Sequence, residues 1–152
     1  MSAATTAQVR LALAPFDPAA ELAAFAATHA DAGGVVSFLG QVRAGEGVDA
    51  LELRHFVPLT LPGMERLAHA AQARWALAGL LIVHRSGVMA PGEPIVLVAA
   101  AARHRRDAFV AVDYAMDHLK SDSWFWKRER VGGEWRWIEP RAEDHADLAR
   151  WA

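Results

Sequence analysis

Two continuous apolar segments near the middle of the chain most constrain what it can fold into. Residues 80–85 read LLIVHR and residues 95–100 read IVLVAA, and the turn-rich Pro91-Gly92-Glu93-Pro94 lies between them. Apolar runs of this length without alternation are typical of strands that are buried on both faces. The sequence therefore predicts two buried strands that build a central sheet.

Three segments have the spacing or the start signals of helices. Asp17-Pro18 provides an N-cap and a first-turn proline for an Ala-rich helix that extends to about Ala30. A second helix is predicted to start at Pro62 and to cover a face of the sheet. The third and clearest amphipathic helix spans residues 105–120. Its predicted apolar face consists of Ala108, Phe109, Val112, Ala115, Met116 and Leu119.

The remaining extended segments predict more strands. Residues 9–13 alternate, and residues 35–43 form a β-rich run that we expect to be a central strand, with Arg43 at its end. After a flexible loop, residues 49–55 alternate and are predicted to pair with residues 35–43 as a hairpin.

A second hairpin is predicted near the end of the chain. Residues 124–131 and 134–139 flank Gly132-Gly133, a pair that favours a tight turn. Period-two alternation places Phe125, Lys127 and Glu129 on one face of the first strand. The charged segment 141–152 is expected to be a surface helix or a tail.

Composition limits the possible classes of protein. The 152 residues, 53% of them hydrophobic and 22% charged, predict one α/β domain that spans residues 1–152 and needs no disulfide or structural metal. Cysteine is absent, which excludes a thiolate nucleophile and fits a reducing compartment. No apolar run is long enough to cross a bilayer, and the first ten residues lack the pattern of a signal peptide. We therefore expect a cytoplasmic protein with no membrane partner.

Cationic residues in the last third form the strongest chemical signal. His104-Arg105 opens the third helix, where free backbone N–H groups favour an anion such as phosphate. Lys120 closes the same helix, where a lysine can also serve only to offset the helix dipole. Lys127 lies among tryptophans, where burial or neighbouring cations would lower its pKa and make it a base or a nucleophile. Glu129 is expected to orient Lys127 or to pair with it.

Other kinds of site have less support. The sequence contains no His-Glu-x-x-His motif, no phosphate-binding glycine loop and no Gly-x-Ser-x-Gly elbow, so neither a metal site nor a serine hydrolase is expected. A rival interpretation is a nucleic-acid-binding module, because tryptophans interleaved with cations in the last hairpin could stack bases. The net charge of −2 argues against it, and we expect no nucleic-acid partner.

Several motifs occur in an order that resembles one enzyme family. They are Phe38-Leu39-Gly40-Gln41-Val42-Arg43, His84-Arg85-x-Gly87, His104-Arg105, Met116-x-x-x-Lys120 and Phe125-Trp126-Lys127-x-Glu129. On these residues the chain resembles the large, catalytic subunit of molybdopterin synthase. The resemblance extends to Arg150-Trp151. Residues 57–61 are an insertion relative to the family pattern.

The resemblance implies an α/β hammerhead fold with a mixed or antiparallel sheet, flanking helices and the hairpin described above. It also implies a homodimer at the centre of a heterotetramer, with a small ubiquitin-like subunit at each outer end. The C-terminal Gly-Gly of that partner carries a thiocarboxylate, which gives sulfur twice to cyclic pyranopterin monophosphate and produces molybdopterin. No bound cofactor is expected.

The resemblance also assigns roles to individual residues. Lys120 and Lys127 would be catalytic, and Phe38 and Met116 would line the channel for the partner's tail. A final set would bind the substrate: Arg43, His104, Arg105 and Arg141. Arg105 and Lys120 are 15 positions apart on one predicted helix, which is roughly 22 Å at about 1.5 Å per residue. If both serve one site, we expect them to come from two copies of the chain.

Overall fold

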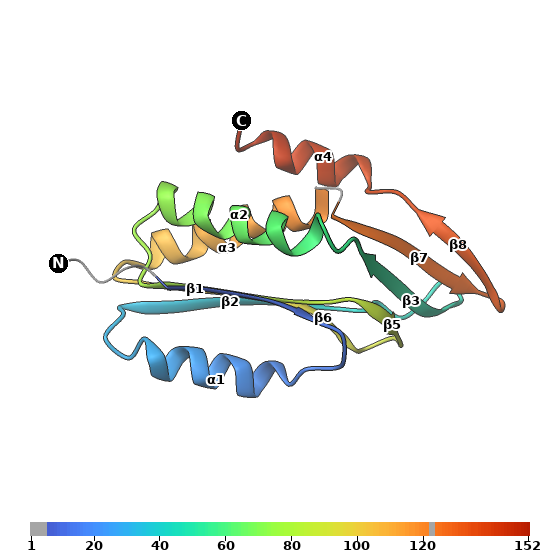
Figure 1. Cartoon of the computed structure of the whole chain (residues 1–152), viewed down its shortest axis with the longest axis horizontal. Helices are drawn as coiled ribbons and strands as arrows, with labels where there is room; N and C mark the ends of the chain where they lie inside the picture. The colour runs from blue at the N-terminus through green and yellow to red at the C-terminus, as the bar shows by residue number, and fades with distance from the viewer. Residues whose placement is uncertain (1–5, 122–123) are drawn as a thin grey trace.

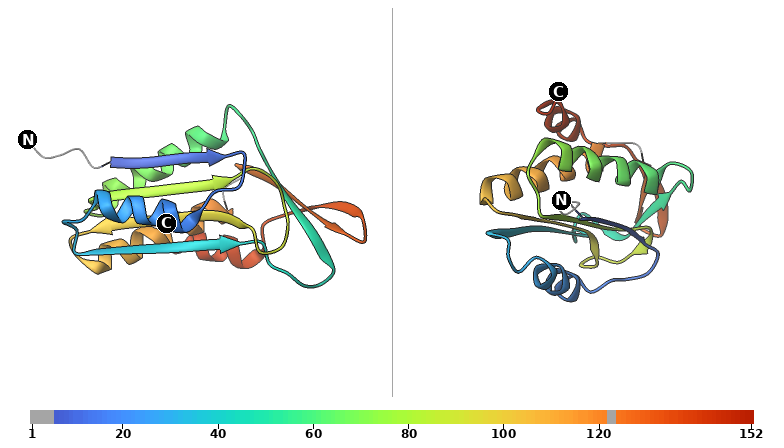
Figure 2. Two further views of the ribbon diagram at one scale, coloured as in Figure 1. Left: turned by 90° about the horizontal axis from the view of Figure 1, so that it is seen from below. Right: turned by 60° about the vertical axis from the view of Figure 1, so that its left-hand side comes forward.

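A mixed four-stranded sheet forms the centre of the protein. The computed structural model describes residues 6–121 and 124–152, and Figure 2 shows the sheet from below. In spatial order its strands are β1 (Thr6–Ala12), β4 (Gly79–Arg85), β6 (Pro94–Ala102) and β2 (Gly34–Gln41). β1 lies parallel to β4, and the other neighbours are antiparallel. The two predicted buried strands, β4 and β6, are the inner ones.

Helices cover both faces of this sheet, which explains why every residue of β4 and all residues of β6 after Pro94 are buried. α1 (Pro18–Thr28) lies on one face, and α2 (Thr60–Arg74) and α3 (Arg105–Ser121) lie on the other (Figure 1). Leu81 and Val83 belong to the apolar cluster that contains Phe25 of α1. Leu80 and Ile82, one position out of phase, belong to the larger cluster on the α2 and α3 side.

The helices begin and end close to their predicted limits. Asp17 is the N-cap of α1, and its Oδ1 accepts hydrogen bonds from the backbone N–H groups of Ala19 and Ala20 at 3.0 and 3.2 Å. One prediction for α3 is wrong, because Phe109 is 53% exposed. Ala111 and Tyr114 are buried instead, so the buried stripe is rotated away from Phe109.

A second, antiparallel sheet continues from one end of the first. Its strands, in spatial order, are β5 (Gly87–Met89), β3 (Val48–His55), β7 (Phe125–Val131) and β8 (Glu134–Ile138). β7 and β8 are the predicted hairpin, and both turn glycines have positive φ, 60° at Gly132 and 81° at Gly133. The three-residue strand β5 was not predicted.

Two predictions about strand pairing are wrong. β2 is an edge strand rather than a central one, because among the strands that the structure describes it pairs only with β6. β3 does not form a hairpin with β2 but pairs with β5 and β7 in the other sheet. The physical reason lies in the loop between them, where Gly45, Glu46 and Gly47 all have positive φ and turn the chain out of the first sheet. The predicted architecture of a mixed sheet, flanking helices and a terminal hairpin is otherwise confirmed.

The chain then leaves β8 and forms a surface helix, α4 (Ala142–Ala149), which runs alongside α3. None of its residues is buried. This outcome matches the first of the two alternatives predicted for residues 141–152.

Candidate active site

The end of α3, the strand β7 and the start of α4 converge around a cavity of about 260 Å³, which we call the lysine pocket. Its floor is apolar and comes from the strands and from the end of α3. Its polar groups come from separate elements. The lining consists of Leu51, Leu53, His84, Ile95, Leu119, Lys120, Phe125, Lys127, Glu129, Ile138, Glu139, Pro140, Arg141 and Asp144.

Lys120 and Lys127 are the only two lysines in the chain, and both line this pocket. The other 14 of its 16 Lys and Arg side chains are arginines. An arginine keeps its proton under all ordinary conditions, whereas a lysine can lose one when its surroundings disfavour the charge. The pocket therefore holds the only two side-chain amines that the chain could use as a base or a nucleophile.

The surroundings lower the pKa of both lysines. Partial desolvation is the main cause of the lowered pKa of Lys120, and the positive charge of Lys127 adds to it. Desolvation likewise lowers the pKa of Lys127, while the carboxylate of Glu129 opposes the shift. Both side chains remain accessible to solvent through the pocket. Each amine is therefore more readily deprotonated than a free lysine, and it can still reach a ligand.

Strand register explains why Lys127 points into the pocket. Lys127 pairs with Leu53 of β3 and with Ile138 of β8, both of which also line the cavity. Phe125 and Glu129, two residues away on either side, share this face as predicted. The carboxylate of Glu129 accepts hydrogen bonds from Arg136 at 2.7 and 3.0 Å. Glu129 thus contributes a negative charge near Lys127 while its orientation is set by Arg136.

His84 is a neutral group in the wall of the pocket. Burial lowers its pKa to about 3, although a hydrogen bond between Nδ1 and the backbone oxygen of Arg85, 2.9 Å long, acts in the opposite direction. Because that oxygen can only accept, Nδ1 carries the proton. The ring stacks on Phe125 with centroids 4.1 Å apart. His84 is part of a family motif, but the sequence predicted no role for it in the site, because a histidine inside an apolar strand is more often a core residue.

Arg141 and Asp144 form the mouth of the pocket at the start of α4. The guanidinium of Arg141 donates to Oδ1 of Asp144 at 3.2 Å, and the backbone N–H of Arg141 donates to Oδ2 at 3.1 Å. Partial burial would raise the pKa of Asp144, but these hydrogen bonds and the charge of Arg141 lower it. The pocket therefore holds a carboxylate as well as cations. Asp144 was not predicted, since it lies in a segment that reads as solvated surface.

A second cavity, of about 470 Å³, adjoins the lysine pocket and brings Arg43 to it. We call it the arginine groove. It is lined by residues 41–46 with Val48, and it shares six residues with the lysine pocket: Leu51, Ile95, Lys120, Lys127, Glu129 and Arg141. The structure thus brings together five of the predicted site residues, Arg43, Lys120, Lys127, Glu129 and Arg141.

The other predicted site residues lie elsewhere. His104 and Arg105 are at the opposite end of α3 from Lys120, since α3 is one continuous helix from Arg105 to Ser121. Phe38 lies on the edge strand β2 and is 43% exposed. Met116 lies one turn before Lys120 on α3 and packs against the core. Neither Phe38 nor Met116 lines the lysine pocket or the arginine groove.

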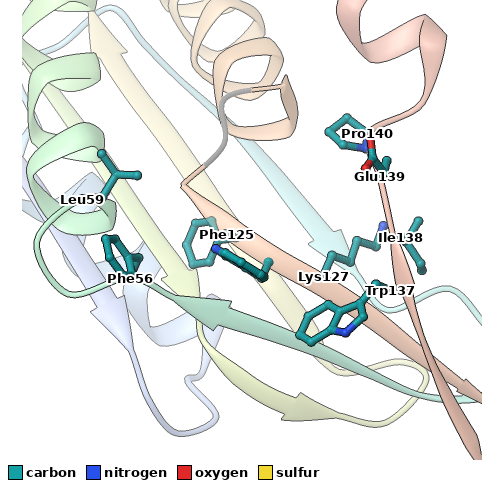
Figure 3. Close-up of a pocket in the computed structure, with 9 residues that line it drawn as sticks. Phe56, Leu59, Phe125, Lys127, Trp137, Ile138, Glu139 and Pro140 are labelled. Carbon is teal, nitrogen blue, oxygen red and sulfur yellow. The ribbon is translucent and has the colours of Figure 1, made fainter.

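A third cavity, of about 570 Å³, opens beside Lys127 and is mainly apolar. We call it the aromatic cavity. Figure 3 shows Phe56 and Leu59 on one side of it and Trp137, Ile138 and Pro140 on the other, with Phe125 and Lys127 of β7 between. The complete lining is Phe56, Leu59, Phe125, Trp126, Lys127, Trp137, Ile138, Glu139 and Pro140. Leu59 lies in the segment 57–61, which the resemblance to the family predicts to be an insertion.

Two arginines of the hairpin, Arg128 and Arg130, are already engaged within the protein. Arg128 lies 4.4 Å from the ring centroid of Trp135, and its Nε donates to Glu52. Arg130 lies 5.5 Å from the same ring and donates to Asp49 at 2.6 Å. Because these groups neutralise and cover one another, the hairpin offers little free positive charge to a nucleic-acid backbone. Nothing in the geometry favours the rival interpretation.

Two negative findings apply to residues 6–121 and 124–152. No group of three or more His, Asp or Glu side chains there is arranged to hold a metal ion. No helix in the same residues is long and apolar enough to cross a membrane.

Comparison with known proteins identifies the family. The model of the MoaE protein family matches residues 11–122. A molybdopterin synthase catalytic subunit from Caulobacter vibrioides is 48% identical over 138 residues, which cover 90% of this chain and 92% of the relative. The chain belongs to the MoaE family. A second relative of the same name, from Ralstonia nicotianae, is 42% identical and covers 94% of this chain and 83% of its own length.

Solved structures in the MoaE family share the whole architecture. A molybdopterin biosynthesis MoaE protein from Burkholderia ambifaria superposes with a TM-score of 0.81 at 40% identity, covering 95% of this chain and 97% of that one. Molybdopterin synthase from Staphylococcus aureus superposes with a TM-score of 0.74 at 26% identity, covering 84% and 94%. The family predicted from the sequence motifs is therefore confirmed.

Proposed function

We propose that this chain is the catalytic subunit of a molybdopterin synthase. It converts cyclic pyranopterin monophosphate to molybdopterin, and the two sulfur atoms come from the thiocarboxylated C-terminus of a small ubiquitin-like subunit. The observation that carries the proposal is the pair of lysines in one pocket, both with lowered pKa, in a chain that belongs to the MoaE family. The enzyme has no cysteine, so its sulfur must be delivered by the partner. The same proposal places it in the cytoplasm.

Lys120 and Lys127 have complementary roles in this chemistry. The thiocarboxylate sulfur bonds to a carbon of the substrate and displaces an oxygen substituent from it: the C–O bond breaks, the oxygen takes up a proton, and a thioester joins substrate and partner. The neutral amine of Lys120 then activates a water that attacks the acyl carbon, or attacks it directly to form an amide that water later hydrolyses. The acyl C–S bond breaks in either case, the sulfur remains on the substrate, and the partner leaves with a C-terminal carboxylate. Lys127 transfers protons and stabilises the negative charge that develops during sulfur addition.

The partner's tail needs a narrow route to the lysines. The aromatic cavity shares Phe125, Lys127, Ile138, Glu139 and Pro140 with the lysine pocket, so an extended Gly-Gly segment lying in it would end beside the amines. Phe38 and Met116 stay predicted contacts of the same tail. Deletion of the Gly-Gly tail should remove activity and most of the affinity between the subunits. Full affinity after the deletion would exclude an inserted tail.

Anionic and polar parts of the substrate bind to the cations around the pocket. Arg43 and Arg141 line the arginine groove together with both lysines. His104 and Arg105 supply the phosphate site at the start of α3, where the helix dipole and free N–H groups favour an anion. These two residues are too far along α3 from Lys120 for one small molecule to reach both within one chain, since 15 residues span about 22 Å.

The active site is therefore shared by two copies of the chain in a homodimer, the core of a heterotetramer with two small subunits. The test mixes an Arg105→Ala chain with a Lys120→Ala chain under conditions that exchange subunits. Each mixed dimer then contains one site with both residues and one with neither, so activity should reappear from two inactive parents. If differentially tagged mixed dimers form and stay inactive, the two residues do not act in one shared site.

The proposed function itself is tested by reconstitution. The purified chain is mixed with a thiocarboxylated small subunit and cyclic pyranopterin monophosphate, and dithiolene formation is measured. Lys120→Ala and Lys127→Ala should nearly abolish product, and Lys→Arg at either position should not restore it, because arginine keeps the charge but cannot act as an amine. Arg10→Ala on β1 is the control for a lost surface cation. Near-normal turnover in both lysine variants would refute the assignment.

A further inference from the structure

The helix α4 carries part of the lysine pocket, yet little holds it to the protein. Arg141 and Asp144, at its start, line the pocket, and none of its eight residues is buried. An isolated helix of this length is unstable in water, so its position must come from tertiary contacts. Among the described elements, α3 makes the most extensive contact with α4.

Further contacts with α3 come from the two residues just after α4, Arg150 and Trp151. Arg150 Nη2 donates to Oδ1 of Asp113 at 3.0 Å and to Oδ2 of Asp117 at 2.5 Å. Trp151 Nε1 donates to the same Asp117 oxygen at 2.6 Å. Both aspartates are on α3, one turn apart. We call Arg150 and Trp151, together with these two partners, the latch.

The ring of Trp151 is the apolar part of the latch. It makes edge-on contacts with Trp75 and Tyr114, at centroid distances of 5.8 and 5.4 Å. Arg74 of α2 donates to the backbone oxygen of Trp151 at 3.3 Å. The indole is thus fixed by a hydrogen bond at one edge and by aromatic packing elsewhere, a combination that specifies one orientation.

At the other end of α4 a hydrogen bond from Ser121 holds the helix near the pocket. The hydroxyl of Ser121, the last residue of α3, donates to the backbone oxygen of Asp144 at 2.6 Å. Asp117 and Ser121 are one turn apart on α3. Asp117 contacts Trp151, which follows α4, whereas Ser121 contacts Asp144 near the start of α4. α4 is therefore laid antiparallel along the end of α3, beside Lys120 (Figure 1).

We propose that the latch is a positioning device for catalysis: Arg150 and Trp151 hold α4 so that Arg141 and Asp144 stay over Lys120 and Lys127. The inference rests on the proposed function and deepens it. A residue that only stabilised the fold would change the unfolding temperature and leave the pocket unchanged. A positioning residue must also change the environment of the two lysines and the binding of substrate.

The lysine environment provides a readout of this kind. Lys120 is faced by charged or titratable groups from β4, β7, the segment after β8, α4 and the loop after β2. These groups are His84, Lys127, Glu129, Glu139, Arg141, Asp144, Arg43 and Glu46. Desolvation is the largest cause of the lowered pKa of Lys120, whereas the charge of Asp144 acts to raise that pKa.

Two perturbations of α4 should therefore have opposite effects. Release of the whole helix reduces the partial desolvation of Lys120, the largest cause of its lowered pKa, so that pKa should rise toward the ordinary value. Asp144→Asn keeps a side-chain oxygen that can accept the backbone N–H of Arg141 but removes the negative charge, so the pKa of Lys120 should fall further. General destabilisation of the fold does not predict this pair of opposite shifts.

The experiment uses the full chain, in which only two side-chain amines can be labelled. Both lysines are ¹³C-dimethylated and their titrations are followed by NMR in the wild type, in Arg150→Gln/Trp151→Ala, in Trp151→Phe and in Asp144→Asn. Arg10→Gln, which removes an ion pair with Glu21 at the surface, is the matched control. The latch double variant should titrate at higher pH, Asp144→Asn at lower pH, and Trp151→Phe between the double variant and the wild type.

Steady-state kinetics with the small subunit give the second readout. The double variant should raise KM for the cyclic pterin about tenfold or more, because small displacements of site residues have large effects on rate and binding. If the double variant does not fold, Trp151→Phe carries the test. Unchanged lysine titrations and KM in a folded latch variant would overturn the proposal. A wild-type chain that makes no dithiolene would refute the proposed function instead, and the lysine titrations would still test the latch.

Discussion

Acid should destabilise this protein through His84. The side chain is 3% exposed, and burial lowers its pKa to about 3. In the unfolded chain the pKa returns to about 6.5. Between these values the unfolded state binds a proton that the folded state excludes. The stabilisation is therefore fully present above pH 6.5 and is lost as the pH falls from there toward 3.

The size of the effect follows from the difference between the two pKa values. Each pH unit below 6.5 lowers the free energy of unfolding by about 1.4 kcal/mol until the folded-state pKa is reached. Between pH 7 and pH 5, His84 alone should therefore lower it by about 2 kcal/mol. This is a large fraction of the stability of a typical domain, which is about 5–15 kcal/mol.

The matched variant is His84→Asn, which keeps an N–H donor near the position of Nδ1 and cannot titrate in this range. Urea unfolding, followed by tryptophan fluorescence at fixed protein concentration, gives the free energy of unfolding at pH 7 and pH 5 for both proteins. The variant loses the stack on Phe125 and should be less stable at pH 7, but its change between the two pH values should be smaller by about 2 kcal/mol. Equal changes in both proteins would refute a buried neutral His84.

Three further predictions concern the site and the fold. Glu129→Gln removes a charge that raises the pKa of Lys127, so the pH–rate profile should move to lower pH, and an unmoved profile would exclude this coupling. Arg43→Ala should raise KM for the cyclic pterin roughly tenfold with a smaller change in kcat, as expected for a lost charged hydrogen bond, and an unchanged KM would count against substrate contact. Gly33→Ala would place a Cβ 2.0 Å from the backbone oxygen of Arg103, so the free energy of unfolding should fall by about 2 kcal/mol or more in urea titrations. If Gly33→Ala has the same free energy of unfolding as the wild type, the backbone segments at Gly33 and Arg103 can move apart without destabilising the fold.

The sequence predicted correctly those strands and turns that are determined by a few neighbouring residues. Leu80–Val83 alternate between two clusters on opposite faces of the sheet, and the continuous apolar run reports this directly. Gly132-Gly133 specifies a hairpin for a similarly local reason, because both residues adopt positive φ. Partner choice between distant strands is not encoded in this way. Leu51 pairs with Glu129, and no pattern near either residue identifies the other.

The site was predictable in part, for related reasons. From its position alone, Lys120 was interpreted as a cation that offsets the dipole at the end of a helix. Only the resemblance to a family predicted that Lys120 and Lys127 act in one site. Asp144 gave no signal, because its role depends on α4 lying against α3 and on a bond from Ser121, which is 23 positions earlier. No role in the site was predicted for His84, because its apolar neighbours in the sequence indicated a buried core strand.

The choice of cations shows why this pocket is suited to amine chemistry. The chain uses arginine at 14 positions and lysine at two, and both lysines lie in one cavity. Partial desolvation is the main cause of the lowered pKa of both lysines, and neighbouring positive charges add to it: Lys127 at Lys120, and Arg141 and Arg43 at Lys127. Two arginines in the same place would repel each other but would remain protonated. The crowding of like charges, which costs stability, thus produces a reactive group only with lysine. Asp144 and Glu129 then limit the cost, because each supplies a negative charge near the pair while hydrogen bonding to an arginine rather than to a lysine. Among residues 6–121 and 124–152 this arrangement gives the amines no fixed carboxylate partner, and a substrate or a thiocarboxylate can take that place.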